Sequence, residues 1–99
     1  SMSERKQKMR ELADCFVCLP GSYGTMDEMM DVVASGTVGE HDRPLFVLNY
    51  NGFYEALRKH EQHMQALSFL PKVSHYAPIF VDTIDGLINA LETLKNNKK

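Results

Sequence analysis

The sequence has no long apolar run, no block of like charge and only two cysteines. A helix that crosses a bilayer needs about 20 consecutive, mostly apolar residues, and the N-terminus lacks the pattern of a secretory signal. We therefore expect no membrane segment and a cytoplasmic location. The 11 basic and 13 acidic side chains give a net charge of −2, so the chain lacks the basic excess of a nucleic-acid-binding protein.

The two cysteines form a C-x-x-C pair, Cys15 and Cys18, in the run DCFVCLP. This spacing occurs in redox and zinc sites, but the chain has no second cysteine pair to complete a zinc site. In an extended strand, positions i and i+3 point to opposite faces, which holds the two sulfur atoms apart. We expect two core thiols in a reducing compartment, and no bound metal.

Apolar spacing alternates between helical and strand periods along the chain. It predicts helices over 3–13, 25–36, Phe53 to the break at Pro71, and Ile84 to Leu94, and strands over 15–19, 44–50 and 77–82. Short continuous apolar runs are typical of buried parallel strands. One helix followed by three strand–helix units predicts an α/β fold with a Rossmann-like parallel sheet and helices on both faces. Asp82 or Thr83 is expected to cap the last helix.

Ninety-nine residues allow one domain at most, so residues 1–99 are predicted to form a single α/β domain. Three parallel strands make a narrow, incomplete sheet, and the chain opens on a helix with no strand before it. We expect this domain to be the C-terminal part of a larger Rossmann-like domain, or a subunit that needs a partner.

A glycine-rich turn, PGSYGT, links the first predicted strand to the following helix. Ligands of open α/β sheets bind beyond the carboxyl ends of the strands. Gly21 and Gly24 allow close backbone approach, the helix N-terminus offers N–H groups to an anion, and Ser22 and Thr25 add hydroxyl donors. These features favour a bound phosphate.

A second interpretation of the same stretch needs no ligand. Thr25-x-x-Glu28 matches a capping box, in which the glycines serve only to make the turn. The stretch is neither a Walker loop nor a G-x-G-x-x-G fingerprint. The residues alone leave both interpretations open.

Three ordered motifs resemble those of the LOG family, whose members are often labelled lysine decarboxylases. The segment PGSYGTMDE, from Pro20 to Glu28, resembles the signature P-G-G-x-G-T-x-x-E, with Ser22 in place of the second glycine. MSERKQKM, from Met2 to Met9, resembles M-x-x-R-K-x-x-M, and GEHDRP resembles G-x-H-x-K-P. The resemblance extends to about Leu67. Family members carry further strand–helix units before the point where this chain begins.

The resemblance implies a hydrolase that cleaves the N-glycosidic bond of a nucleoside 5′-monophosphate, either AMP or a cytokinin riboside monophosphate. The products would be the free base and ribose 5-phosphate. It implies catalytic roles for Glu28 and Arg5, with no metal and no cofactor. It also implies a phosphate site made of Gly21, Ser22, Tyr23, Gly24 and Thr25. Two alternatives remain, which are a nucleotide-binding module without turnover and a structural fragment with an empty turn.

Arg5 has some support from the residues themselves, since it shares a predicted helix face with Met9 and Leu12. The alternative is a surface arginine whose stem covers apolar neighbours. The pair His60 and His63 lies in a charged helix without the H-E-x-x-H spacing, which favours a solvated face over a metal site. For His41 we expect a loop hydrogen bond.

The helix over 25–36 is apolar around about half of its circumference, wider than the usual single stripe. Burial by its own sheet and by a second subunit would explain this width, and LOG-family proteins are similar in pairing through this region. The alternative is a helix deeply buried in a larger domain. We predict a homodimer.

Overall fold

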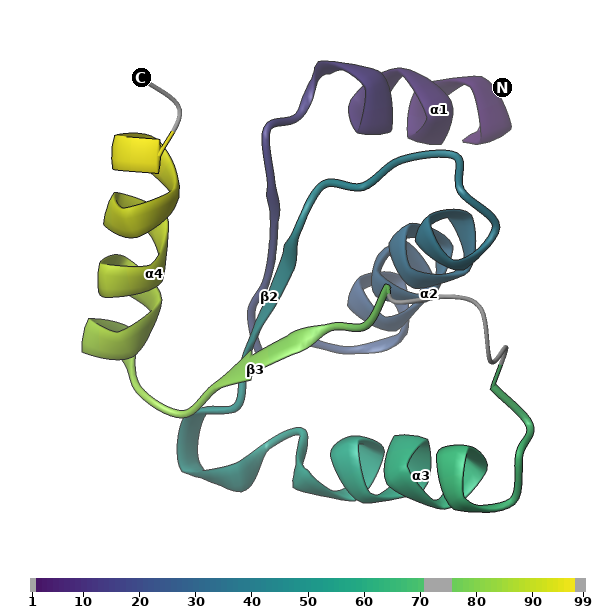
Figure 1. Ribbon diagram of the computed structural model, residues 1–99, viewed down its shortest axis with the longest axis vertical. Helices are drawn as coiled ribbons and strands as arrows, with labels where there is room; N and C mark the ends of the chain where they lie inside the picture. The colour runs from purple at the N-terminus through teal and green to yellow at the C-terminus, as the bar shows by residue number, and fades with distance from the viewer. Residues whose placement is uncertain (1, 71–75, 98–99) are drawn as a thin grey trace.

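The computed structural model describes residues 2–70 and 76–97, and confirms the predicted order of elements (Figure 1). The elements are α1 (Met2–Leu12), β1 (Phe16–Cys18), α2 (Tyr23–Thr37), β2 (Leu45–Leu48), a 3-10 turn (Tyr50–Gly52), α3 (Glu55–Ala66), β3 (Ile79–Val81) and α4 (Ile84–Asn97). Pro71, the predicted end of the third helix, lies outside the described residues. Within the described ranges, no helix has the length and apolar content that crossing a membrane requires.

The three strands form one parallel sheet in the order β1-β2-β3. Phe16 pairs with Leu45, and Phe46 pairs with Ile79. Because all strands run the same way, their carboxyl ends meet at a single edge of the sheet, the lower edge in Figure 1. The predicted α/β class with a narrow parallel sheet is confirmed.

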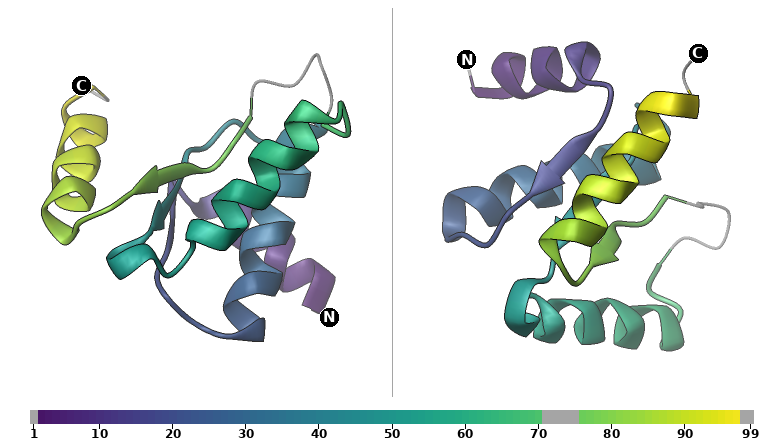
Figure 2. Two further views of the ribbon diagram at one scale, coloured as in Figure 1. Left: turned by 90° about the horizontal axis from the view of Figure 1, so that it is seen from below. Right: turned by 90° about the vertical axis from the view of Figure 1, so that its left-hand side faces the viewer.

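Helices cover both faces of the sheet, with α4 on one side and α1, α2 and α3 on the other (Figure 2). Against α2, the larger core cluster includes Phe16, Met29, Val32, Leu45 and Val47. Against α4, the smaller cluster consists of Phe46, Leu48 and Leu87. Alternate strand residues therefore supply opposite cores, as the two-residue period of a strand requires.

The two cysteines follow this alternation and are free thiols. Cys18 belongs to the cluster beneath α2, whereas Cys15 packs against the cluster beneath α4. The prediction that a strand separates the two sulfur atoms onto opposite faces is confirmed.

The turn before α4 carries one of the two predicted capping interactions. The backbone N–H of Gly86 donates to Oγ1 of Thr83 at 2.9 Å. A hydroxyl oxygen that accepts from the first turn satisfies an N–H group that the helix itself leaves unpaired. Of the two expected caps, the structure selects Thr83.

The second strand is shorter than predicted and ends at Leu48. Asn49 and the 3-10 turn that follows leave the sheet, and Asn51 adopts a φ of 53° and Gly52 a φ of 73°. This tight turn delays α3, which begins at Glu55 rather than near Phe53. The Asn/Gly-rich turn therefore lies at the carboxyl edge of the sheet, beside the glycine turn that follows β1.

Candidate active site

The glycine turn lies where ligands of parallel sheets bind, at the carboxyl end of β1. Leu19 to Ser22 connect Cys18 to the first residue of α2, and all four connecting residues are exposed. Tyr23, with 90% of its surface exposed, and Gly24 begin the helix. The first N–H groups of a helix have no partner within it, so this turn presents backbone donors to solvent.

Gly21 is required by the turn itself. A Cβ atom added at Gly21 would lie 2.2 Å from Oγ1 and 2.8 Å from Cβ of Thr25. The side chain of Thr25 is therefore folded back onto the turn. Gly24 differs, because a Cβ added there meets nothing within 4 Å. The open space over Gly24 faces outward from the exposed start of the helix.

The capping box predicted from Thr25 and Glu28 is wrong. The helix begins two residues earlier than expected, with Ser22 as the N-cap residue, and Thr25 lies inside the first turn. The backbone N–H of Met26 donates to the carbonyl oxygen of Ser22 at 3.0 Å. Among the described residues, the Ser22 side chain makes no capping hydrogen bond. Its hydroxyl is therefore not committed to the helix end.

Glu28 borders a hollow of about 270 Å³ between α1, the exposed edge of β1 and α2. Thr25 and Glu28 are three residues apart, so they share one face of the helix, and both line this hollow. The other lining residues are Met9, Phe16, Val17, Cys18, Leu19, Pro20, Met29, Val32 and Leu45. One exposed carboxylate thus stands at the rim of a mostly apolar recess beside the glycine turn.

Ion pairs hold α1, which supplies Met9 to the lining of this hollow, along α2. Lys6 Nζ lies 2.8 Å from Asp27 Oδ2, and this hydrogen bond raises the pKa of Lys6. One turn further along both helices, Arg10 pairs with Asp31, and its guanidinium also lies 3.6 Å from Glu40. The matched spacing of four residues in each helix was a sequence signal for this pairing, and the sequence analysis missed it.

Arg5 is exposed on α1, one turn before Met9. Met9 lines the hollow with Glu28, but the described lining residues do not include Arg5. The structure therefore brings Glu28, Thr25 and the start of the glycine turn together around this hollow, and Arg5 is not among the residues that line it. A catalytic role for Arg5 stays a prediction.

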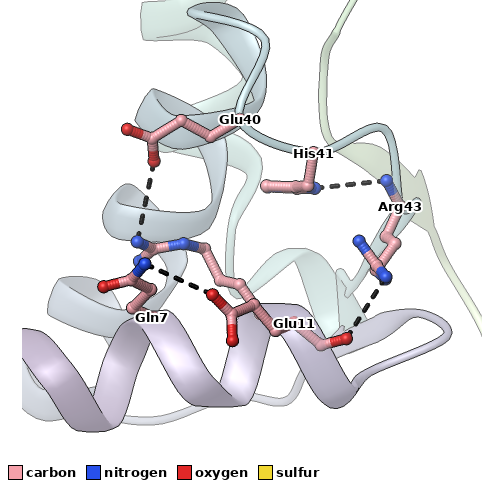
Figure 3. A pocket seen from close by; sticks show the side chains of 6 residues that line it. Gln7, Glu11, Glu40, His41 and Arg43 are labelled. Carbon is pink, nitrogen blue, oxygen red and sulfur yellow. Dashed lines mark hydrogen bonds and ion pairs between the residues drawn. The ribbon is translucent and has the colours of Figure 1, made fainter.

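A second hollow, of about 380 Å³, lies between α1 and the loop before β2 (Figure 3). Its cationic groups already have partners, since Arg10 pairs with Asp31 and Glu40, and Arg43 donates to the carbonyl oxygen of Glu11 at 3.3 Å. Acidic side chains thus offset Arg10, a backbone carbonyl oxygen occupies Arg43, and Glu11 and Glu40 add negative charge to the lining. This hollow is therefore a poor site for an anion.

His41, on the wall of the second hollow, makes the predicted loop hydrogen bonds. The backbone N–H of Arg43 donates to its Nδ1 at 3.1 Å, and its Nε2 lies 2.9 Å from the carbonyl oxygen of Val32. The first contact makes Nδ1 an acceptor, so Nε2 carries the proton and donates. The buried ring ties the loop to α2 and packs edge-on against Phe16 and Tyr76.

A third hollow, of about 580 Å³ and larger than the other two, lies between α2 and α3. Its walls are mainly apolar and include Met30, Val33 and Met64. Burial raises the pKa of Glu61, the one carboxyl group among its described lining residues. Neither the glycine turn nor Glu28 contributes to this hollow.

Metal binding finds no support in the described ranges, which contain no group of three or more His, Cys, Asp or Glu side chains placed to hold an ion. His60 and His63 are both exposed on α3.

Comparison with known proteins gives one family. A sequence model of the family described as "possible lysine decarboxylase" matches residues 1–91. A probable cytokinin riboside 5′-monophosphate phosphoribohydrolase of Oryza sativa subsp. japonica is 35% identical over 92 residues, covering 93% of this chain and 40% of the relative.

Two further relatives carry the name cytokinin riboside 5′-monophosphate phosphoribohydrolase. The protein of Mycobacterium marinum is 34% identical over 90 residues, 91% of this chain and 48% of the relative. The protein of Arabidopsis thaliana is 46% identical over 56 residues, 57% of this chain and 25% of the relative. The chain therefore spans less than half the length of these relatives.

Proposed function

This chain belongs to the LOG family, described as possible lysine decarboxylases, and we propose that it contributes the phosphate-binding turn and the catalytic carboxylate of a nucleoside 5′-monophosphate phosphoribohydrolase. The reaction is hydrolysis of the N-glycosidic bond. The substrate class is AMP or a cytokinin riboside 5′-monophosphate, in line with the names of the relatives.

One observation carries this proposal. The exposed glycine turn leads directly into the N-terminus of α2. Glu28 lies about one helical turn further along, on the same face as Thr25 and at the rim of a recess. Backbone N–H groups at a helix N-terminus attract phosphate. A carboxylate about one helical turn away reaches the sugar that the phosphate carries. The two groups that the reaction needs therefore lie next to each other.

The turn would hold the 5′-phosphate through the backbone N–H groups of Tyr23 and Gly24 and the hydroxyl of Ser22. As the bond between C1′ and the base breaks, positive charge develops on the ribose ring, and the carboxylate of Glu28 stabilises it. Glu28 also orients water and accepts its proton while the water oxygen bonds to C1′. The base leaves with the bonding electron pair and takes up a proton from solvent.

Decarboxylation, which the family description suggests, has less support in this chain. A lysine that forms a Schiff base is activated by a lowered pKa. Lys6 is the lysine at a defined position of the matched motifs, and its hydrogen bond to Asp27 raises its pKa instead. Its ammonium group is committed to the contact between α1 and α2.

The proposal predicts that the chain releases adenine and ribose 5-phosphate from AMP, measured by chromatography. Adenosine is the matched control, because it has the same glycosidic bond and lacks the phosphate that the turn would bind. We expect at least about 100-fold slower release from adenosine, since remote binding energy contributes to catalysis. Binding of AMP without adenine release would favour a binding module, and absence of both would reject the proposal for this chain.

We also propose that two copies pair through α2. Met30, Ala34 and Val38 recur at every fourth position and so form one stripe along the helix. All three are exposed, Met30 by 42% and Val38 by 74%. Burial of this stripe by a second copy would account for the wide apolar surface of the helix. Light scattering at micromolar concentration is expected to give the mass of a dimer, and a monomer mass would contradict the pairing.

A further inference from the structure

Tyr54 is a buried residue that contacts the start of the glycine turn from the core side. It lies between the 3-10 turn and α3, and only 3% of its surface is exposed. Its hydroxyl donates to the carbonyl oxygen of Leu19 at 2.7 Å. Leu19 is the residue that leads from β1 into Pro20 and Gly21. One side chain from the second strand–helix unit thus holds the first residue of the turn that follows β1.

The backbone of Tyr54 is held as firmly as its hydroxyl. Its N–H donates to Oδ1 of Asn49 at 2.7 Å, and the N–H of Asn49 donates to the carbonyl oxygen of Val81 at 2.7 Å. Asn49 is 3% exposed, and its Nδ2 donates to Oε1 of Glu55 at 3.0 Å. A continuous series of hydrogen bonds therefore joins the carboxyl ends of β3, β2 and β1.

The hydroxyl of Tyr54 is satisfied on both sides. The thiol of Cys18 donates to it at 3.5 Å while it donates to Leu19. Burial raises the pKa of Tyr54, and a backbone hydrogen bond from Gly21 acts against that rise. The group therefore stays a protonated donor at neutral pH. Losing one partner of a buried hydrogen bond leaves the other unsatisfied, which destabilises the structure around it.

We propose that Tyr54, oriented by Asn49, is a positioning residue that fixes the glycine turn in the shape that binds the 5′-phosphate, an inference that rests on the proposed function. The phenol ring does not touch the substrate. It acts on the turn from the core side, through the hydrogen bond that its hydroxyl donates to the carbonyl oxygen of Leu19. Its contribution belongs to the phosphate end of the ligand and not to the base.

Tyr76 offers a matched control at the opposite edge of the sheet. Its hydroxyl donates to the carbonyl oxygen of Arg43 at 2.8 Å, and burial raises its pKa to about 12. Arg43 precedes β2, at the amino end of the strands, away from the glycine turn. Tyr54→Phe and Tyr76→Phe each remove one hydroxyl that donates to a backbone carbonyl oxygen, and each keeps the ring, which is buried in Tyr54 and half-buried in Tyr76.

The test combines amide hydrogen exchange, followed by NMR, with titration of ribose 5-phosphate and adenosine into the wild type and both variants. In Tyr54→Phe, we expect the Gly21 amide to exchange about 10-fold faster, because the turn loses a hydrogen bond. A factor of ten corresponds to a change of about 1.4 kcal/mol in the free energy of opening the turn. The Kd for ribose 5-phosphate should rise by a similar factor, while the Kd for adenosine changes little. Tyr76→Phe should leave all three quantities near those of the wild type.

Equal acceleration of Gly21 exchange in both variants, or none in Tyr54→Phe, would overturn the inference, since the hydroxyl would then act through overall stability or not at all. An unchanged Kd for ribose 5-phosphate in Tyr54→Phe, with the wild type binding it, would also overturn it. Failure of the wild type to bind ribose 5-phosphate would instead reject the proposed function, and Gly21 exchange would still decide whether Tyr54 holds the turn.

Discussion

Replacing Glu28 with Gln is expected to lower kcat for AMP hydrolysis by about 10²–10⁴-fold, the range found when a positioned acid–base group is removed. The amide keeps the size and shape of the side chain at the rim of the hollow but can neither accept a proton from water nor stabilise positive charge on the ribose. Binding of ribose 5-phosphate should change little, because the turn and not the carboxylate holds the phosphate. The measurement is release of adenine from AMP, with binding followed separately by titration.

Asp27→Asn is the matched control for Glu28→Gln. Asp27 precedes Glu28 in α2, and Asp27→Asn removes the same charge. The Asp27 carboxylate, however, pairs with Lys6 of α1. An exposed ion pair of this kind contributes little to stability, so we expect less than a 10-fold loss of activity. Equal losses in both variants would assign the effect to negative charge near α2 in general, and would contradict a specific role for Glu28.

The order of elements could be predicted from sequence because the strands of a parallel sheet read as short, continuous apolar runs. Leu45 to Leu48 are all buried, which produces the uninterrupted apolar run that marks the strand. The two-residue period of an extended chain explains the separation of Cys15 and Cys18 onto opposite cores. These features depend only on the spacing of nearby residues, which can be read from a single sequence.

The start of α2 and the role of Tyr54 could not be predicted from sequence periodicity. The pattern of Thr25 and Glu28 matches a capping box locally, yet the chain enters the helix at Tyr23, and Thr25 packs against Gly21 instead. Tyr54 and Leu19 are 35 positions apart. No periodicity relates a tyrosine in one unit to a carbonyl group in another, so only the folded chain reveals the contact.

The two glycines of the turn are expected to respond in opposite ways to alanine. In Gly21→Ala the new methyl group meets Cβ of Thr25 at 2.8 Å as well as Oγ1 at 2.2 Å. Rotating the threonine side chain moves Oγ1 but not Cβ, so the backbone of the turn must shift. Overpacking of this kind costs about 1–3 kcal/mol. For a chain of this size we expect Tm to fall by about 4–24 °C, since 1 kcal/mol shifts Tm by about 4–8 °C.

Gly24→Ala supplies the contrast within the same turn. The added methyl group meets nothing within 4 Å and lies in the first turn of α2, so the higher helix propensity of alanine should raise stability by about 0.5–1 kcal/mol. Both variants should bind ribose 5-phosphate more weakly, Gly21→Ala because the turn is displaced and Gly24→Ala because the methyl group occupies space that the phosphate approaches. Thermal unfolding and titration together separate the two effects. Unchanged affinity in the more stable Gly24→Ala would mean that the phosphate does not approach the turn at Gly24, and would favour a glycine there that serves the turn alone.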